Sequence, residues 1–357
     1  METYNYSYDY LVDYDYDYYN STTIRVKQEP SHNAGDIARI LSVVVYSLTC
    51  LLGILGNGLV ITIITFKMKK SINAIWFLNL AVADFLFNVF LPLNIAYTAM
   101  NYHWVFGAAM CKLNSFLLNL NLYSSVLLLT TISLDRCVSV VLPVWAQNHR
   151  TTTLACLVCV VDWVLGLVMS SPSLVFRDTA THEGNVICFS NYTLSGNKYD
   201  HPLGMRRHQT VNLVRFLTGF VIPVTIITVC YMIIVVKLKR NRLAKSKKPF
   251  KIIVTIIVTF FLCWTPYHVL NLLETQHEQV SHVVFKIGIP ITTALAAASS
   301  CMNPILYVFM GQDFKKFKVT ILSRLLNALS EDATPSTLAQ RSFSKMSSMT
   351  EKDTTLL

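Results

Sequence analysis

Three ionisable residues lie inside otherwise apolar stretches of this chain: Asp84, Asp162 and Arg215. A charge in hydrocarbon costs about 2.5–3.5 kcal/mol on insertion scales, so such residues usually face the protein interior and carry a function. The candidate polar neighbours of Asp84 lie in other apolar stretches and are Asn57, Asn121, Ser125, Ser300 and Asn303. Because Asn121 and Ser125 are four residues apart, they share one helix face. This set could hold a small cation; the alternative is a neutral Asp84 that only bonds its neighbours.

Arg215 would lie about 9 Å inside an apolar stretch that begins near residue 209. A planar guanidinium is suited to holding a carboxylate through two parallel hydrogen bonds. Arg206, Arg207 and His208 precede it and would attract anions. The alternative is that Arg215 extends along the helix to reach water. Asp162 has no evident partner; we expect it to point toward the protein core near Trp163.

The apolar stretches themselves predict the architecture. Of the 357 residues, 53% are hydrophobic and 14% are charged, against about 25% charged in soluble domains. Seven segments with at most one charge each run over 40–66, 71–110, 113–134, 151–176, 208–236, 252–273 and 287–312. Each reaches the roughly 20 residues that cross a bilayer as a helix. The composition excludes a soluble enzyme, a disordered protein and a nucleic-acid-binding domain, and predicts an all-α, seven-transmembrane helix bundle.

Basic residues predict the orientation of that bundle. The segments on one side carry 17 lysines and arginines, against nine on the other side. By the positive-inside rule the richer side is cytoplasmic. The three glycosylation sequons, at Asn5, Asn20 and Asn191, then all fall outside. We therefore expect a multi-pass plasma-membrane protein with an extracellular N-terminus and a cytoplasmic C-terminus.

Four regions follow from the pattern. Residues 1–37 form an acidic, tyrosine-rich tail, which is either a solubilising leader or a docking strip for a basic protein. Residues 38–310 form the transmembrane domain. Residues 311–328 predict a short amphipathic juxtamembrane helix, since Phe314, Phe317, Ile321 and Leu325 recur at helical spacing. Residues 329–357 form a hydroxyl-rich cytoplasmic tail suited to phosphorylation.

Two of the nine cysteines, Cys111 and Cys188, are placed on the oxidising side by this topology. We therefore expect a disulfide between them. The stretch from Val186 to Phe189 could pair with Ser173 to Phe176 as a hairpin over the mouth of the bundle.

One motif in each span resembles the rhodopsin-like G-protein-coupled receptors. The motifs are Gly56-Asn57, Leu80-Ala81-Val82-Ala83-Asp84, Asp135-Arg136-Cys137, Trp163, Pro223 with Tyr231, Cys263-Trp264-Thr265-Pro266, and Asn303-Pro304-Ile305-Leu306-Tyr307. The resemblance covers about residues 38–327. Within that family, Trp76-Phe77-Leu78-Asn79-Leu80, Arg240 to Lys245 and Lys247 to Lys251 resemble the chemoattractant group.

The resemblance implies a switch for G-protein coupling. Its residues would be Asp135, Arg136, Tyr231, Trp264, Pro266, Asn303, Pro304 and Tyr307. Arg136 would be freed on activation to contact a G protein, and Tyr231 and Tyr307 would move in to hold the open state. Trp264 would form the floor of the ligand pocket, and Pro266 would supply the kink that amplifies its movement. Asp84, Asn121, Ser125, Ser300 and Asn303 would form an allosteric sodium site.

The expected ligand-binding residues are Arg215, Asn94, Asn119, His268, Asn271, Glu274 and Trp264. The ligand would be a peptide or protein chemoattractant or, alternatively, a carboxylated lipid. An inhibitory G protein, arrestin, receptor kinases and membrane lipid are the other expected partners; nucleic acid is not. We expect no enzymatic activity, no cofactor and no catalytic metal.

Other membrane functions fit less well. Residues 287–312 contain no lysine for a retinal Schiff base, and residues 113–134 contain no acidic residue for an amine ligand. A transporter would be expected to show internal repeats or broken helices, and a channel a filter built from repeated loops. Neither pattern is present in the sequence, which leaves a signalling receptor.

Overall fold

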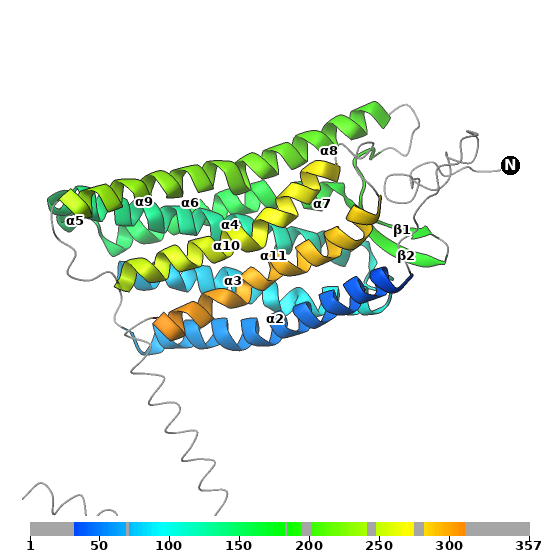
Figure 1. Cartoon of the computed structure of the whole chain (residues 1–357), viewed down its shortest axis with the longest axis horizontal. Helices are drawn as coiled ribbons and strands as arrows, with labels where there is room; N and C mark the ends of the chain where they lie inside the picture. The colour runs from blue at the N-terminus through cyan, green and yellow to red at the C-terminus, as the bar shows by residue number, and fades with distance from the viewer. Residues whose placement is uncertain are drawn as a thin grey trace, which may run out of the picture. The chain divides into compact units, whose positions relative to one another are not determined.

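The computed structural model describes residues 32–68, 71–182, 184–194, 201–240, 248–274 and 282–310. Long helices account for most of them and run side by side (Figure 1). They are α2 (His32–Phe66), α3 (Ile72–Ala99), α4 (Gly107–Val141), α6 (Thr152–Ser170), α8 (His201–Phe216) continued by a π-turn η2 (Leu217–Val221) and α9 (Ile222–Arg240), α10 (Lys248–Glu274) and α11 (His282–Met310). The all-α class and the seven-helix bundle are confirmed; the helix expected at 311–328 lies outside the described residues.

Five helical segments are long and apolar enough to cross a membrane within the searched, described part of the chain: Gly35–Phe66, Ile72–Ala99, Gly107–Val141, Thr152–Phe176 and Pro202–Lys237. The helices α10 and α11 contain 27 and 29 residues and complete the seven. Large apolar side chains such as Leu55, Val236 and Leu262 are more than 60% exposed. Such exposure fits contact with lipid tails rather than with water.

Local sequence signals set the helix ends. The hydroxyls of Ser71 and Thr151 accept hydrogen bonds from the backbone N–H of Ala74 and Leu154, both at 3.2 Å, so each caps the helix that follows it. Between α3 and α4 the chain reverses through Asn101, which has a left-handed φ of 55°. The apolar segment expected at 71–110 is therefore a helix to Ala99 followed by a turn.

The fifth span begins earlier than the sequence indicates. Its helix starts at His201, whereas the apolar stretch starts near residue 208. Arg206 and Arg207 lie on these added turns. A membrane-spanning helix can continue beyond the hydrocarbon, because polar side chains there reach water. Arg215 is consequently in the last turn of α8, just before the π-turn η2.

A two-stranded sheet covers one end of the bundle, here called the hairpin end (Figure 1). Strand β1 (Arg177–His182) pairs antiparallel with β2 (Asn185–Ser190), with Arg177 opposite Ser190. The expected pairing of Val186 to Phe189 with Ser173 to Phe176 is therefore wrong: the partner strand is β1, which follows Phe176 in the chain. Ser173 to Phe176 lie in α7 (Pro172–Phe176), because Pro172 favours the first turn of a helix. The opposite end carries α5 (Pro143–His149) and is called the α5 end.

The predicted disulfide between Cys111 and Cys188 is present, with a Cα–Cα distance of 5.7 Å. It joins the first turns of α4 to the middle of β2. The backbone N–H of Trp104 also donates to Val186 O at 2.7 Å. Trp104 is 1% exposed and thus firmly packed. The disulfide and this hydrogen bond therefore attach the hairpin to the bundle at two points.

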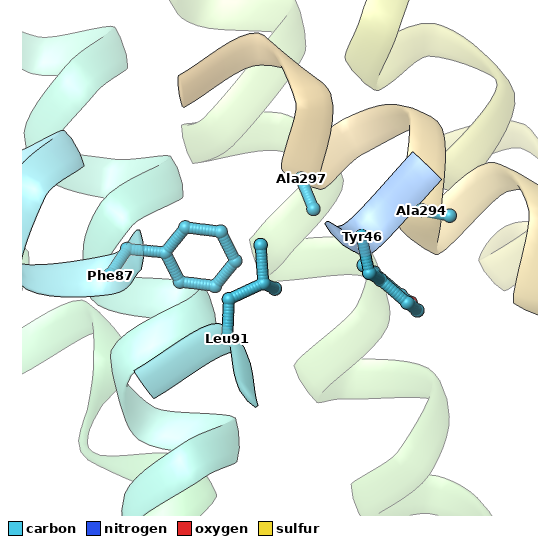
Figure 2. Packing of buried hydrophobic residues seen from close by; sticks show 5 residues of the cluster. All are labelled: Tyr46, Phe87, Leu91, Ala294 and Ala297. Carbon is cyan, nitrogen blue, oxygen red and sulfur yellow. The ribbon is translucent and has the colours of Figure 1, made fainter. Parts of the chain in front are cut away.

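Apolar packing among α2, α3 and α11 forms a buried cluster of Tyr46, Phe87, Leu91, Ala294 and Ala297. In Figure 2 Phe87 and Leu91 of α3 lie next to the small Ala297 of α11, with Tyr46 of α2 beside Ala294. The alanines allow the helix backbones to approach closely, as is common where helices pack in membranes. This contact places the polar residues of the three helices next to one another.

Gly53 gives a test of this close packing. A Cβ at Gly53 would lie 2.3 Å from Asn88 side-chain atoms. Asn88 cannot move freely, because its Nδ2 donates to Asp84 O at 2.7 Å and to Ser300 Oγ at 3.0 Å. We expect Gly53→Ala to lower the free energy of unfolding by about 1–3 kcal/mol, the usual cost of overpacking.

The measurement is the melting temperature of the purified protein in detergent. Gly58→Ala is the matched control, because its Cβ would meet Phe85 at 3.4 Å, an ordinary contact. Equal melting temperatures for the two variants would show that α2 can move away from α3 at little cost.

Candidate ligand pocket and coupling site

Asp84 lies in the middle of α3 and is 1% exposed. Its Oδ1 accepts hydrogen bonds from Asn121 Nδ2 at 2.9 Å and from Ser125 Oγ at 3.5 Å, and its Oδ2 accepts from Asn303 Nδ2 at 2.8 Å. Three of the five expected neighbours therefore meet at this carboxylate. They come from α4 and α11, so the site joins three helices.

The other two expected neighbours, Ser300 and Asn57, lie one step away. Ser300 exchanges hydrogen bonds with Asn88, and Asn57 Nδ2 donates to Ser300 O at 2.9 Å. Asn88 was missed, although its position one turn after Asp84 on α3 is the signal that could have found it. It connects the carboxylate site to α11.

The oxygen atoms around Asp84 fit a small hard cation. Such cations take oxygen ligands in proteins, and the carboxylate and Ser125 Oγ lie together here. Asn121 Oδ1 is buried and has no hydrogen-bond partner among the described residues. An unsatisfied buried acceptor is costly, and Asn121 directs its Nδ2 rather than this oxygen toward the carboxylate.

Asp162 has a partner that the sequence did not reveal. Its Oδ2 accepts a hydrogen bond from Thr131 Oγ1 on α4 at 3.0 Å. The neighbouring Trp163 donates from Nε1 to Asn79 Oδ1 on α3, also at 3.0 Å. Both residues of α6 therefore fix the angle at which this helix meets α3 and α4.

At the hairpin end, Arg215 is half-buried on α8. Its NH1 donates to Asn212 Oδ1 at 3.0 Å. It also lies close enough to Glu274 and to the hydroxyl groups of Tyr123, Tyr192 and Tyr267 to interact with them electrostatically. The guanidinium thus lies among polar side chains of the bundle.

The predicted Glu274 belongs to the same charged group. It interacts with Arg177 of β1 as well as with Arg215. Arg177 was not among the expected ligand-binding residues, because its place on the hairpin depends on the strand register. A ligand entering here would meet two arginines and one carboxylate.

The expected asparagines bond within the protein. Asn94 and Asn114 exchange a reciprocal pair of amide hydrogen bonds, both at 3.0 Å. Asn119 Nδ2 donates to Ser173 Oγ of α7 at 2.8 Å. Asn271 Nδ2 donates to Tyr267 O at 2.8 Å. These contacts place Asn94, Asn119 and Asn271 on α3, α4 and α10, toward the hairpin end.

Below this level lies an aromatic layer around His268, which is 2% exposed. Its ring packs against Phe220, Trp264 and Tyr267 at centroid distances of 5.4, 6.2 and 5.6 Å. Its Nε2 is buried without a hydrogen-bond partner among the described residues. Trp264 Nε1 in turn donates to Ser299 Oγ at 3.0 Å, which ties α10 to α11 two residues before Pro266.

Polar residues at the α5 end form a second charged group. Asp135 and Arg136 of α4 are adjacent, and Arg136 NH2 lies 3.7 Å from Asp135 Oδ2. Tyr231 of α9 is near enough to interact electrostatically with Arg136.

Two further residues of the expected switch belong to α11. Pro304 is buried against Gly56, where a Cβ added to Gly56 would lie 2.8 Å from Pro304 Cγ. Tyr307 belongs to α11, but its side chain lies outside the described part.

Of the three sequons, Asn5 and Asn20 lie outside the described residues. Asn191 follows β2 and is partly exposed. Its Oδ1 accepts hydrogen bonds from Thr193 Oγ1 at 2.9 Å and from Leu194 N at 3.2 Å. Its glycosylation stays a prediction.

The described geometry combines seven helices, a buried carboxylate network, a basic pocket at one end and an Asp-Arg pair at the other. Residues 56–307 match the family model of the 7 transmembrane receptor (rhodopsin family). The chain belongs to this receptor family. It is therefore a multi-pass membrane receptor and not an enzyme.

Several relatives are receptors by name, and one of them is named as a chemotactic receptor. Chemerin-like receptor 1 of Sus scrofa is 61% identical over 358 residues, which cover 95% of this chain and 99% of the relative. Chemerin-like receptor 1 of Homo sapiens is 63% identical, with 87% and 85% covered. The C3a anaphylatoxin chemotactic receptor of Oncorhynchus mykiss is 43% identical, with 83% and 80% covered. The predicted resemblance to the chemoattractant group is confirmed.

Proposed function

We propose that this receptor binds a chemerin-like protein through the C-terminal end of the ligand and couples to an inhibitory G protein. Arrestin and receptor kinases would act on the cytoplasmic tail. The hairpin end faces outward in this proposal, and the α5 end faces the cytoplasm. The observation that carries it is the half-buried Arg215, which faces the bundle interior at the hairpin end.

The chemistry of this pocket supports an anionic ligand group. Arg215 has five N–H donors in a rigid fork that matches a carboxylate. Arg177 adds a second positive charge. The carboxylate of Glu274 would repel an anion that approaches Glu274 rather than the arginines. Asn94, Asn119, Asn271 and the aromatic layer of His268 and Trp264 would line the path of the peptide.

Replacing Arg215 tests the ligand claim. Truncating one partner of a desolvated charge pair typically costs about 2–5 kcal/mol. We expect Arg215→Ala to lower the potency of an agonist peptide with a free C-terminus by well over tenfold. The amidated peptide, which has already lost the carboxylate, should change little.

The measurement is a concentration–response curve for both peptides on both receptors at equal surface density. Equal losses for the two peptides would show that Arg215 supports the fold and does not hold the carboxylate. A response to a carboxylated lipid that requires Arg215, with none to either peptide, would favour the lipid alternative.

Sodium is proposed as an allosteric ligand of the Asp84 site, with Asn121, Ser125 and Asn303 around it and Ser300 one step away. An ion that binds one state of the bundle better than another shifts the equilibrium toward that state. We expect sodium to lower agonist affinity, because the oxygen atoms of α3, α4 and α11 converge only while the helices are close.

The readout is agonist binding with sodium or with a large organic cation at the same ionic strength. Asp84→Asn should remove the difference between the two salts. Asp162→Asn is the matched control, because Asp162 is a buried carboxylate bonded to Thr131 in another part of the bundle. Sodium sensitivity that survives Asp84→Asn would place the ion elsewhere.

Arg136 is proposed as the residue that contacts the G protein, with Tyr231 and Tyr307 as its supports in the open state. We expect Arg136→Ala to abolish agonist-driven nucleotide exchange on an inhibitory G protein while the receptor still reaches the cell surface. Arg240→Ala is the control, since Arg240 is an exposed arginine at the end of α9. Normal exchange by Arg136→Ala would remove this assignment.

A further inference from the structure

The carboxylate of Asp135 is held by Arg150 rather than by its neighbour Arg136. Arg150 Nε lies 2.5 Å from Asp135 Oδ1, and Arg150 NH2 lies 2.8 Å from Asp135 Oδ2. Arg136 NH2 lies 3.7 Å from Asp135 Oδ2, which is an ion pair but longer than a hydrogen bond. Arg150 is one of the 17 basic residues on the side that the sequence assigns to the cytoplasm.

The two contacts differ in kind. Arg150 forms two parallel charge-assisted hydrogen bonds, the strongest arrangement between arginine and a carboxylate. The Asp135 side chain is 10% exposed, so these bonds are less screened than those on the surface. Arg150 engages both carboxylate oxygens, whereas Arg136 approaches only Oδ2 and does not form a fork with Asp135.

Asn73 joins the two arginines. Its Oδ1 accepts hydrogen bonds from Arg150 NH2 at 2.9 Å and from Arg136 NH2. Arg136 Nε is buried and has no hydrogen-bond partner among the described residues. Arg136 therefore donates to one neutral amide and lies beside the Asp135 carboxylate and Tyr231, while its Nε is unsatisfied among the described residues.

The backbone fixes Arg150 in this place. Arg150 ends α5, and its N–H donates to Ala146 O at 3.0 Å. The next residue, Thr151, caps α6. The side chain thus leaves a short, well-defined junction between two helices and needs little ordering to reach Asp135.

We propose that Arg150 is a positioning residue for G-protein coupling: by occupying Asp135 it keeps Arg136 weakly held and ready for release. The proposal rests on the proposed role of Arg136 as the residue that contacts the G protein. Without Arg150, the buried carboxylate would be left with Arg136 as its nearest cation, and the two would close into a tight pair. Release of Arg136 would then cost more.

The test is a double-mutant cycle between Arg150 and Asp135, read as nucleotide exchange on an inhibitory G protein at equal surface density. We expect Arg150→Ala to lower basal exchange and to shift agonist potency by about three- to tenfold toward higher concentration. In an Asp135→Asn background the same change should have no effect, because no carboxylate remains to capture Arg136. Arg240→Ala should leave both receptors unchanged, which controls for loss of cytoplasmic positive charge.

Two outcomes would overturn the proposal. An equal loss in both backgrounds would mean that Arg150 contacts the G protein or supports the fold directly. Unchanged or increased exchange for Arg150→Ala alone would mean that it does not hold Asp135 away from Arg136. Arg150→Gln, tested in the same cycle, replaces the alanine variant if that variant does not reach the surface.

The result is separable from the proposed function. If Arg136→Ala abolishes exchange while the cycle shows no coupling, the inference about Arg150 fails and the proposed role of Arg136 stands. If Arg136→Ala signals normally, the proposed role itself has failed.

Discussion

A polar group inside a bilayer has no water to bond, so its partners must come from the protein itself. Asp84 shows what this constraint imposes: its carboxylate accepts from Asn121 and Ser125 of α4 and from Asn303 of α11. These bonds form only at one rotation and one height of each helix. Lipid tails are as apolar as leucine and cannot select that arrangement by themselves. The buried hydrogen bonds therefore specify how the helices align, while the apolar contacts seen in Figure 2 bring them together.

The same constraint links the layers of the bundle. Trp163 and Asp162 bind α6 to α3 and α4 through Asn79 and Thr131. Trp264 binds α10 to α11 through Ser299. Pro266 interrupts the α10 hydrogen-bond ladder near that contact, and prolines are common places for a helix to bend. His268 packs against Trp264 and therefore lies next to the contact that joins α10 to α11.

Sequence reasoning succeeded where one residue type has few possible environments. Stretches with at most one charge predicted the seven helices, and two cysteines on the oxidising side predicted the disulfide. It also brought Asn121, Ser125 and Asn303 to Asp84, because a buried carboxylate requires donors at its depth in the bundle. It missed Thr131, Asn88 and Arg150 because each has a common side chain whose partner depends on helix rotation or on a loop path. The predicted hairpin was wrong in its first strand for a similar reason. Pro172 begins a short helix over residues that were expected to form that strand.

The two charged groups at opposite ends of the bundle differ in how completely they are satisfied. At the hairpin end, within the described part of the chain, the carboxylate of Glu274 interacts with both Arg215 and Arg177. At the α5 end, Arg150 saturates Asp135 and leaves Arg136 with part of its guanidinium unsatisfied. In the proposed function, an anionic ligand and a G protein would supply new partners for Arg215 and Arg136. A ligand and a G protein that supply those partners need only favour the same helix arrangement to favour each other, since coupling between two sites is reciprocal.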